Sequence, residues 1–60
     1  MINVTIEQVA KDMLIEMYGA VLKNRISPYK WSFYKNQLID LGVIENVESL
    51  REDLRKAYEY

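Results

Sequence analysis

The chain of 60 residues contains neither cysteine nor histidine. It therefore cannot form a disulfide, and it lacks the usual ligands of a structural zinc ion. The same absences remove most pairings of nucleophile and general base that enzymes use. The two glycines stand apart, so there is no glycine-rich loop that could hold phosphate. We therefore expect a protein that is not an enzyme and that uses no cofactor and no small-molecule substrate.

Carboxylates are the remaining candidates for metal binding. Asp12 and Glu16 are four residues apart, as are Glu48 and Glu52, so each pair would share one face of a helix. Such pairs could ligate a hard cation, but solvated helix surface is the simpler interpretation. We expect no metal site.

Long apolar runs are also missing. No segment approaches the ~20 apolar residues that a membrane span needs, and the first residues lack the basic-then-apolar layout of a signal peptide. The sequence thus predicts a cytoplasmic protein with no membrane partner. Isoleucine, lysine, asparagine and tyrosine are frequent, which is typical of an AT-rich bacterial or phage genome.

The residues that are present predict an all-α fold, a small three-helix domain over residues 1–60. Thr5 and Gln8 fit a capping box, in which each side chain would bond the other residue's amide, and Val4 and Val9 fit a hydrophobic staple. A first, long helix should follow and end near Asn24, which tolerates the left-handed conformation.

A second helix should begin after Ser27 and Pro28 and stop before Gly42, because serine caps helix starts and glycine ends helices. The link between the first two helices is short, so they should form an antiparallel hairpin. Asn46 can cap a shorter third helix, from residue 47 to about residue 58.

The first helix carries two apolar faces when drawn at ~100° per residue. The main stripe comprises Ile6, Val9, Ala10, Met13, Leu14, Met17, Ala20 and Val21, and the second comprises Ile15, Tyr18 and Leu22. A helix packed on one neighbour does not need the second stripe. A 60-residue chain also buries only ~60% of its unfolded surface. The C-terminal half of this helix should therefore be covered on two sides, by its own chain or by another copy. We expect self-association as a dimer, with Ile15, Tyr18 and Leu22 in the contact.

On the second helix, the expected core arc comprises Trp31, Tyr34, Leu38 and Leu41. Tyr29 and Phe33 fall on a separate face, one turn apart. On the third helix, the expected stripe comprises Val47, Leu50, Leu54, Ala57 and Tyr58.

The segment from residue 23 to residue 37 is both basic and aromatic. Residues 1–16 carry a net charge of −2, residues 17–39 carry +4 and residues 40–60 carry −3. The candidate partner-binding residues in the basic segment are Lys23, Arg25, Tyr29, Lys30, Phe33 and Lys35.

Three interpretations of this segment are open. In the first, Trp31 and Tyr34 belong to the core and the four basic residues keep the protein soluble. In the second, the segment binds nucleic acid, with cations on phosphates and Tyr29 or Phe33 stacked on bases. In the third, it contacts a protein, since exposed aromatics beside cations suit an interface. The first function that we expect is a small protein-interaction module, a regulator or inhibitor from a phage or mobile element that binds a host protein. A DNA-binding transcriptional regulator and a structural or assembly component are the alternatives.

Overall fold

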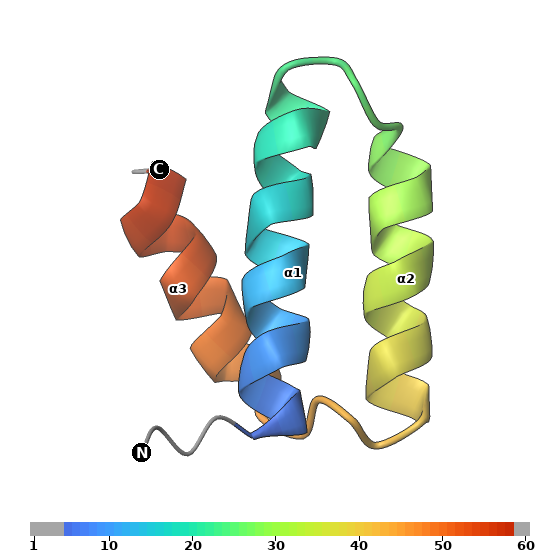
Figure 1. Ribbon diagram of the computed structural model, residues 1–60, viewed down its shortest axis with the longest axis vertical. Coiled ribbons are helices and arrows are strands. Elements are labelled where there is room, and N and C mark those ends of the chain that lie inside the picture. Colours follow the sequence, from blue (N-terminus) through green and yellow to red (C-terminus); the bar gives the residue numbers. More distant parts are fainter. Residues whose placement is uncertain (1–4, 59–60) are drawn as a thin grey trace.

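The computed structural model describes residues 5–58, which form three helices and no strand. Helix α1 spans Ile6–Leu22, α2 spans Pro28–Asp40 and α3 spans Val47–Tyr58. Figure 1 shows α1 in the middle, with α2 antiparallel beside it and α3 inclined against its other side. The prediction of an all-α domain with a long first helix and an antiparallel hairpin is confirmed.

Side-chain caps fix the helix starts, as the sequence predicts. The Thr5 hydroxyl accepts the Gln8 N–H at 3.1 Å, and the Ser27 hydroxyl accepts the Tyr29 N–H at 3.2 Å. The reciprocal bond, in which the Gln8 side-chain oxygen would accept the Thr5 N–H, does not appear among the hydrogen bonds of the described residues, and the Gln8 side-chain amide donates to the Asp12 carboxylate at 3.0 Å. The staple partner Val4 lies outside the described residues.

Left-handed residues end the first two helices. Asn24 has φ 61° and Gly42 has φ 77°. Each reversal lets a following amide bond a carbonyl five residues back, Arg25 to Ala20 at 2.9 Å and Val43 to Leu38 at 3.0 Å. This is the Schellman pattern, so the predicted ends of both helices are confirmed.

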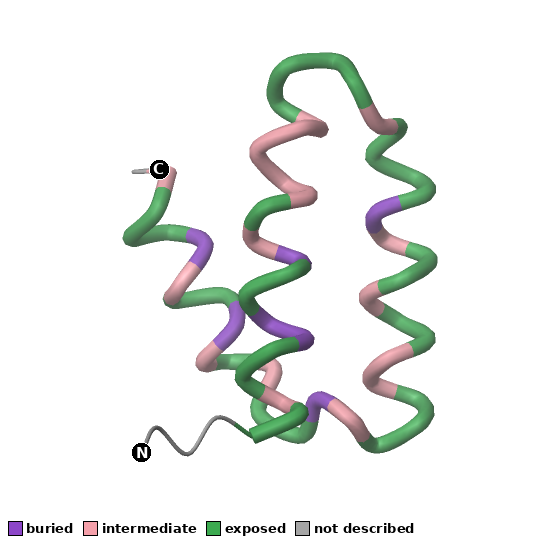
Figure 2. The backbone as a smooth tube through the Cα atoms, viewed as in Figure 1, coloured by how far each residue is buried: buried purple, intermediate pink, exposed green. Residues whose placement is uncertain are grey.

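The core lies where the three helices meet (Figure 2), and its buried apolar members are Ala10, Leu14, Trp31, Ile44, Leu50 and Leu54. Leu14 is the only one of them with no exposed surface at all. Trp31 ties α2 to α1, because its indole N–H donates to the Leu14 carbonyl at 2.8 Å. A buried indole N–H needs such an acceptor, so this bond fixes how the two helices face each other.

Glu7 holds the loop between α2 and α3 against the start of α1. Its Oε2 accepts the backbone N–H groups of Glu45 at 2.8 Å and Asn46 at 3.0 Å. These two bonds, the Asn46 one first, stabilise the charged form and lower the pKa of Glu7. Asn46 in turn caps α3 by accepting the Ser49 N–H at 3.0 Å. The start of α3 is therefore fixed relative to α1.

Lys11 is the one buried charged residue in the described part of the chain. Its ammonium donates to the Ser49 hydroxyl on α3 at 3.2 Å. A lysine stem can bury its carbons while its charged end finds a partner, and here it fills the space between α1 and α3.

Candidate protein-contact surfaces

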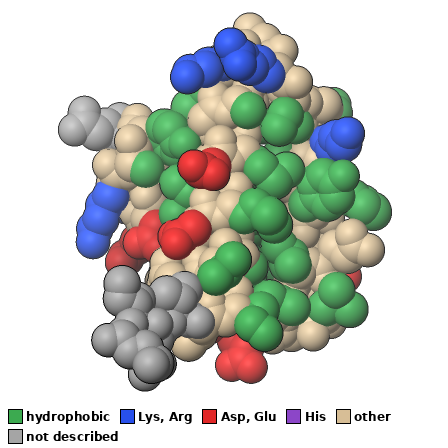
Figure 3. Space-filling model, in the orientation of Figure 1, with side chains coloured by type: hydrophobic (Ala, Val, Ile, Leu, Met, Phe, Trp, Pro, Cys, Tyr) green, Lys and Arg blue, Asp and Glu red, His purple; other side chains and the backbone are tan. Residues whose placement is uncertain are grey.

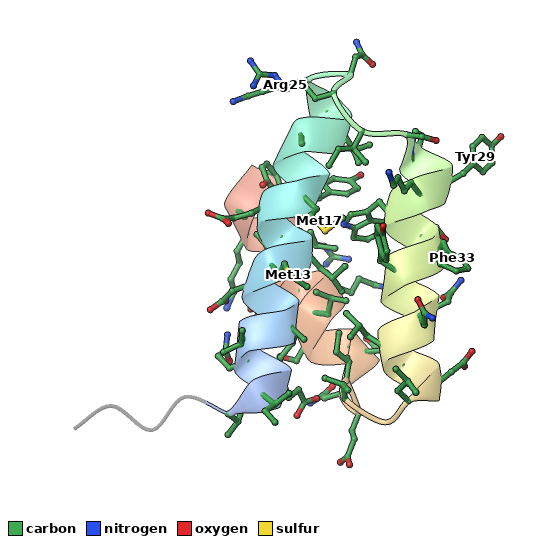
Figure 4. All side chains as sticks on the ribbon, turned by 45° about the vertical axis from the view of Figure 1, so that its right-hand side comes forward. Met13, Met17, Arg25, Tyr29 and Phe33 are labelled. Carbon is green, nitrogen blue, oxygen red and sulfur yellow. The ribbon has the colours of Figure 1, made fainter. Side chains whose placement is uncertain are left out.

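Tyr29 and Phe33 form the outer aromatic pair, a name we use for these two residues. They lie one turn apart on α2, and Figure 4 shows both rings on the side of α2 turned away from α1. Tyr29 is 87% exposed and Phe33 is 61% exposed. Both side chains are therefore open to solvent in the single chain, on a face separate from Trp31.

The edge of the Phe33 ring meets the neighbouring Tyr34 ring, with their centroids 5.9 Å apart at an angle of 64°. Edge-to-face geometry is a favoured aromatic contact. It limits the motion of Phe33 although the ring is exposed. The outer pair is thus presented on a helix whose opposite face is anchored by Trp31.

The four cations of the basic segment do not lie together. Lys23 and Arg25 occupy the turn at one end of the α1–α2 hairpin, where Figure 4 labels Arg25. Lys30 and Lys35 are five residues apart on α2, which places them ~140° apart around its axis. The Lys35 ammonium lies 5.4 Å from the centroid of the Trp31 ring, on the side of α3. Lys35 therefore packs on the core, apart from Tyr29 and Lys30.

The predicted self-association stripe needs a correction. Tyr18 lies between two rings of its own chain, with centroids 5.0 Å from Trp31 and 5.6 Å from Tyr58. Ile15 and Tyr18 both pack against the core, because α3 crosses the face of α1 that the stripe occupies. Leu22 alone remains exposed, at 52%. For Ile15 and Tyr18, the alternative that the stripe is covered by its own chain therefore holds in the described structure.

Gly19 makes this packing of α3 possible. The Tyr58 hydroxyl donates to the Ile15 carbonyl at 2.5 Å, directly above Gly19. A Cβ at position 19 would lie 2.7 Å from that hydroxyl oxygen. Glycine is unfavourable inside a helix, so the close approach of Tyr58 explains its presence.

A groove of about 540 Å³ opens beside this contact. It is lined by Glu16, Gly19, Ala20, Leu22, Lys23, Arg25 and Tyr58. Its charged groups are of both signs, so it does not favour a ligand of one charge.

Among residues 5–58, a different apolar surface is left uncovered. Five exposed side chains belong to it, and we call their surface the open hairpin face: Ile6, Val9, Met13, Tyr34 and Leu41. At ~100° per residue, the first three share one side of α1 and the last two share one side of α2, facing away from the residues that meet α3. Figure 3 shows hydrophobic side chains gathered down the middle of this side, and Figure 4 shows Met13 on the side of α1 away from α3. Tyr34 and Leu41 belong to the apolar arc expected on α2, and the other three belong to the main apolar stripe of α1. All five are exposed, because α3 covers only the other side of the hairpin.

The sequence indicates which apolar residues of α1 share a stripe. It does not indicate which part of that stripe stays exposed. The main stripe of α1 is wider than the surface that one neighbour covers. Half of it, with Ala10 and Leu14, faces the core, and the half with Ile6 and Met13 does not. The width of the stripe was the signal that one part of it would stay open.

No chemistry of another kind competes with these surfaces in the part of the chain that the structure describes. Residues 5–58 hold no group of three or more acidic side chains placed to bind a metal ion. None of the three helices, as far as they are described, has the length and apolar character to cross a bilayer. Comparison of the chain with protein-family models, with curated proteins and with solved structures gives no match.

Proposed function

We propose that this protein is a small, non-enzymatic interaction module that binds another protein through the outer aromatic pair. The observation that carries the proposal is the exposure of Tyr29 and Phe33 on adjacent turns of a fixed helix. Exposed aromatic side chains are enriched among the residues that dominate binding energy, because they bury a large area at a small entropic cost.

The scaffold behind the pair supports this role. Trp31 holds the opposite face of α2 to α1 through its bond to Leu14, and the caps at Ser27 and Gly42 define both ends of the helix. Contact residues on a rigid element lose little conformational freedom on binding. A partner would therefore meet two rings on a helix whose backbone is already in position.

The charges beside the pair indicate the kind of partner. Lys30 is exposed next to Tyr29, and Lys23 and Arg25 lie at the neighbouring turn, whereas the nearest acidic residue on α2 is Asp40 at its far end. A surface with an apolar pocket and an acidic rim is complementary to this arrangement. The residues for the contact are Tyr29 and Phe33 as anchors, with Lys30, Arg25 and Lys23 at the rim.

The test compares two double variants on α2. Tyr29→Ala with Phe33→Ala removes the anchors, and Asn36→Ala with Gln37→Ala removes two exposed polar residues of the same helix. The tagged proteins are used to capture a partner from nuclease-treated bacterial lysate, and the captured protein is then titrated calorimetrically. Each aromatic truncation should cost ~2 kcal/mol, or about 30-fold in Kd, while the control pair should bind as the parent does.

Circular dichroism must show that both double variants keep their helices. If the aromatic double variant unfolds, or if it is folded and binds the partner as tightly as the control pair, the assignment of the outer aromatic pair is wrong. Capture that disappears on nuclease treatment would instead favour the nucleic-acid alternative.

A further inference from the structure

We propose that the open hairpin face is the interface of a homodimer, in which α1 of each copy packs across α2 of the other. The two-fold axis would run parallel to these helices. The five residues of the face differ from the outer aromatic pair, so this inference goes beyond the proposed function and does not depend on it. Lys30 alone borders both surfaces.

The area of the face is the first argument. Its five side chains have exposed fractions between 38% and 76%. Four of the five are aliphatic and lie near the lower end of the range of about 150–250 Å² for an aromatic side chain, so together they expose roughly 500 Å². That is within the upper part of the range for the largest patch on a typical monomer. Two such faces would bury ~1,000 Å², and the polar rim would bring the total to the lower end of the range for stable interfaces.

The levels of the residues along the helices provide the second argument. The start of α1 and the end of α2 lie at the same end of the molecule (Figure 1). At 1.5 Å per residue, Ile6 is then level with Leu41, and Met13 is level with Tyr34. A two-fold axis parallel to the helices keeps each level and exchanges the helices. Ile6 would therefore meet the partner's Leu41, and Met13 would meet the partner's Tyr34.

Charge complementarity fixes this choice of axis. Glu16 borders the face on α1 and Lys30 borders it on α2, each ~15 Å along its helix from the shared end. Figure 3 shows acidic side chains on one side of the hydrophobic band and a basic one on the other. The parallel axis sets Glu16 opposite the partner's Lys30, and it does so twice. A two-fold axis perpendicular to the helices would instead pack α1 on α1 of the other copy. The acidic edge of α1, which contains Asp12 and Glu16, would then face the same edge of the partner.

Such a dimer also completes the core. The two hairpins would form a four-helix layer with the α3 helices outside, an arrangement in which short helices pack stably. A single core of six buried apolar residues is small, and oligomerisation is a common source of stability at this length.

The first test uses two residues of α1 with matched exposure. Met13 is 49% exposed on the open hairpin face, and Leu22 is 52% exposed outside it. Light scattering should give twice the chain mass of 7.1 kDa for the parent and for Leu22→Glu, and the chain mass for Met13→Glu. Because both positions are exposed in the single chain, circular dichroism should show that both variants stay helical.

The second test reverses the charges that the axis pairs. Glu16→Lys and Lys30→Glu should each weaken dimerisation about tenfold, because each sets two like-charge pairs in the interface. An equimolar mixture of the two variants should regain the parent affinity, since each copy then meets the opposite charge twice.

Three results would overturn the proposal. The parent could remain a monomer at millimolar concentration. Leu22→Glu could dissociate the dimer while Met13→Glu does not. Finally, the charge-reversed variants could dimerise as the parent does, alone and mixed, which would exclude the parallel two-fold arrangement.

Discussion

The contact between Gly19 and Tyr58 predicts that Gly19→Ala changes stability in opposite directions, depending on whether residue 58 is tyrosine or phenylalanine. In most helices, replacing an interior glycine with alanine stabilises by ~1 kcal/mol, because alanine restricts the unfolded chain and suits the helix. Here the new Cβ would lie 2.7 Å from the Tyr58 hydroxyl oxygen, which is too close. We expect Gly19→Ala to destabilise the parent protein, and to stabilise a protein that already carries Tyr58→Phe.

The magnitudes follow from what Tyr58 must give up. Moving its hydroxyl breaks the bond to Ile15, worth ~1 kcal/mol, and disturbs the ring contact with Tyr18, worth ~0.5–1.5 kcal/mol. These losses outweigh the helical gain, so Gly19→Ala should cost ~0.5–1.5 kcal/mol. Without the hydroxyl, the nearest atom to the new Cβ is Cζ of the ring at 3.5 Å. In the Tyr58→Phe background the helical gain of ~1 kcal/mol from alanine remains. The effect of Gly19→Ala therefore differs by ~2 kcal/mol between the two backgrounds.

The assay is urea unfolding of the four proteins of the cycle, followed by the fluorescence of Trp31, the only tryptophan. All four are measured at one protein concentration, because self-association makes stability depend on concentration. In a domain of this size, 1 kcal/mol corresponds to ~4–8 °C in Tm, so a thermal melt gives an independent check. If Gly19→Ala raises stability equally in both backgrounds, Tyr58 does not pack on Gly19 as described.

Three further predictions test the positions of single residues. The pKa of Glu7 is lowered in the folded state. Its contribution to the free energy of unfolding is therefore complete above the ordinary glutamate pKa, ~4.3, and is lost as pH falls through the lowered value. Glu7→Gln should reduce stability at pH 7 and make stability depend less on pH in the acid range. Gly42→Ala should cost ~1 kcal/mol in chemical unfolding from its left-handed φ of 77° alone, since a Cβ there meets open space. Leu14→Ala should cost ~3–5 kcal/mol or abolish cooperative unfolding, because Leu14 has no exposed surface; a loss below 1 kcal/mol would contradict its central position.

The helix boundaries were predictable because they depend on local chemistry. Thr5, Ser27 and Asn46 each cap the helix start at which the sequence places them, and Asn24 and Gly42 adopt the left-handed conformation. Capping needs only a side chain and an amide two or three residues away. The position of a helix start therefore depends on the local segment alone.

The direction from which α3 packs was not predictable in the same way. Either apolar stripe of α1 could have received it, and the sequence does not distinguish coverage of Ile15 and Tyr18 by α3 from coverage by a second copy. The structure shows α3 on that stripe. The choice depends on the Glu7 bonds to the loop, on Lys11 with Ser49, and on the space above Gly19. These contacts join residues about forty positions apart, and no periodicity in the sequence reports them.

The outer aromatic pair was identified as a separate face, because Tyr29 and Phe33 do not follow the spacing of Trp31 and Leu38. Tyr34 and Leu41 do follow that spacing, yet they lie on the open side of the hairpin. Helical periodicity indicates which residues share a face. It does not indicate how much of that face a neighbouring helix covers.

The most direct measurement of the open hairpin face uses the two methionines of α1. Their methyl groups are labelled with carbon-13, and a soluble gadolinium chelate is added to broaden the signals of methyls that solvent reaches. Met13 lies on the open hairpin face, and Met17 packs against the core. On dilution of the parent protein, the Met13 signal should change from protected to broadened, while Met17 stays protected throughout. A Met13 methyl that is equally accessible at every concentration would contradict the account.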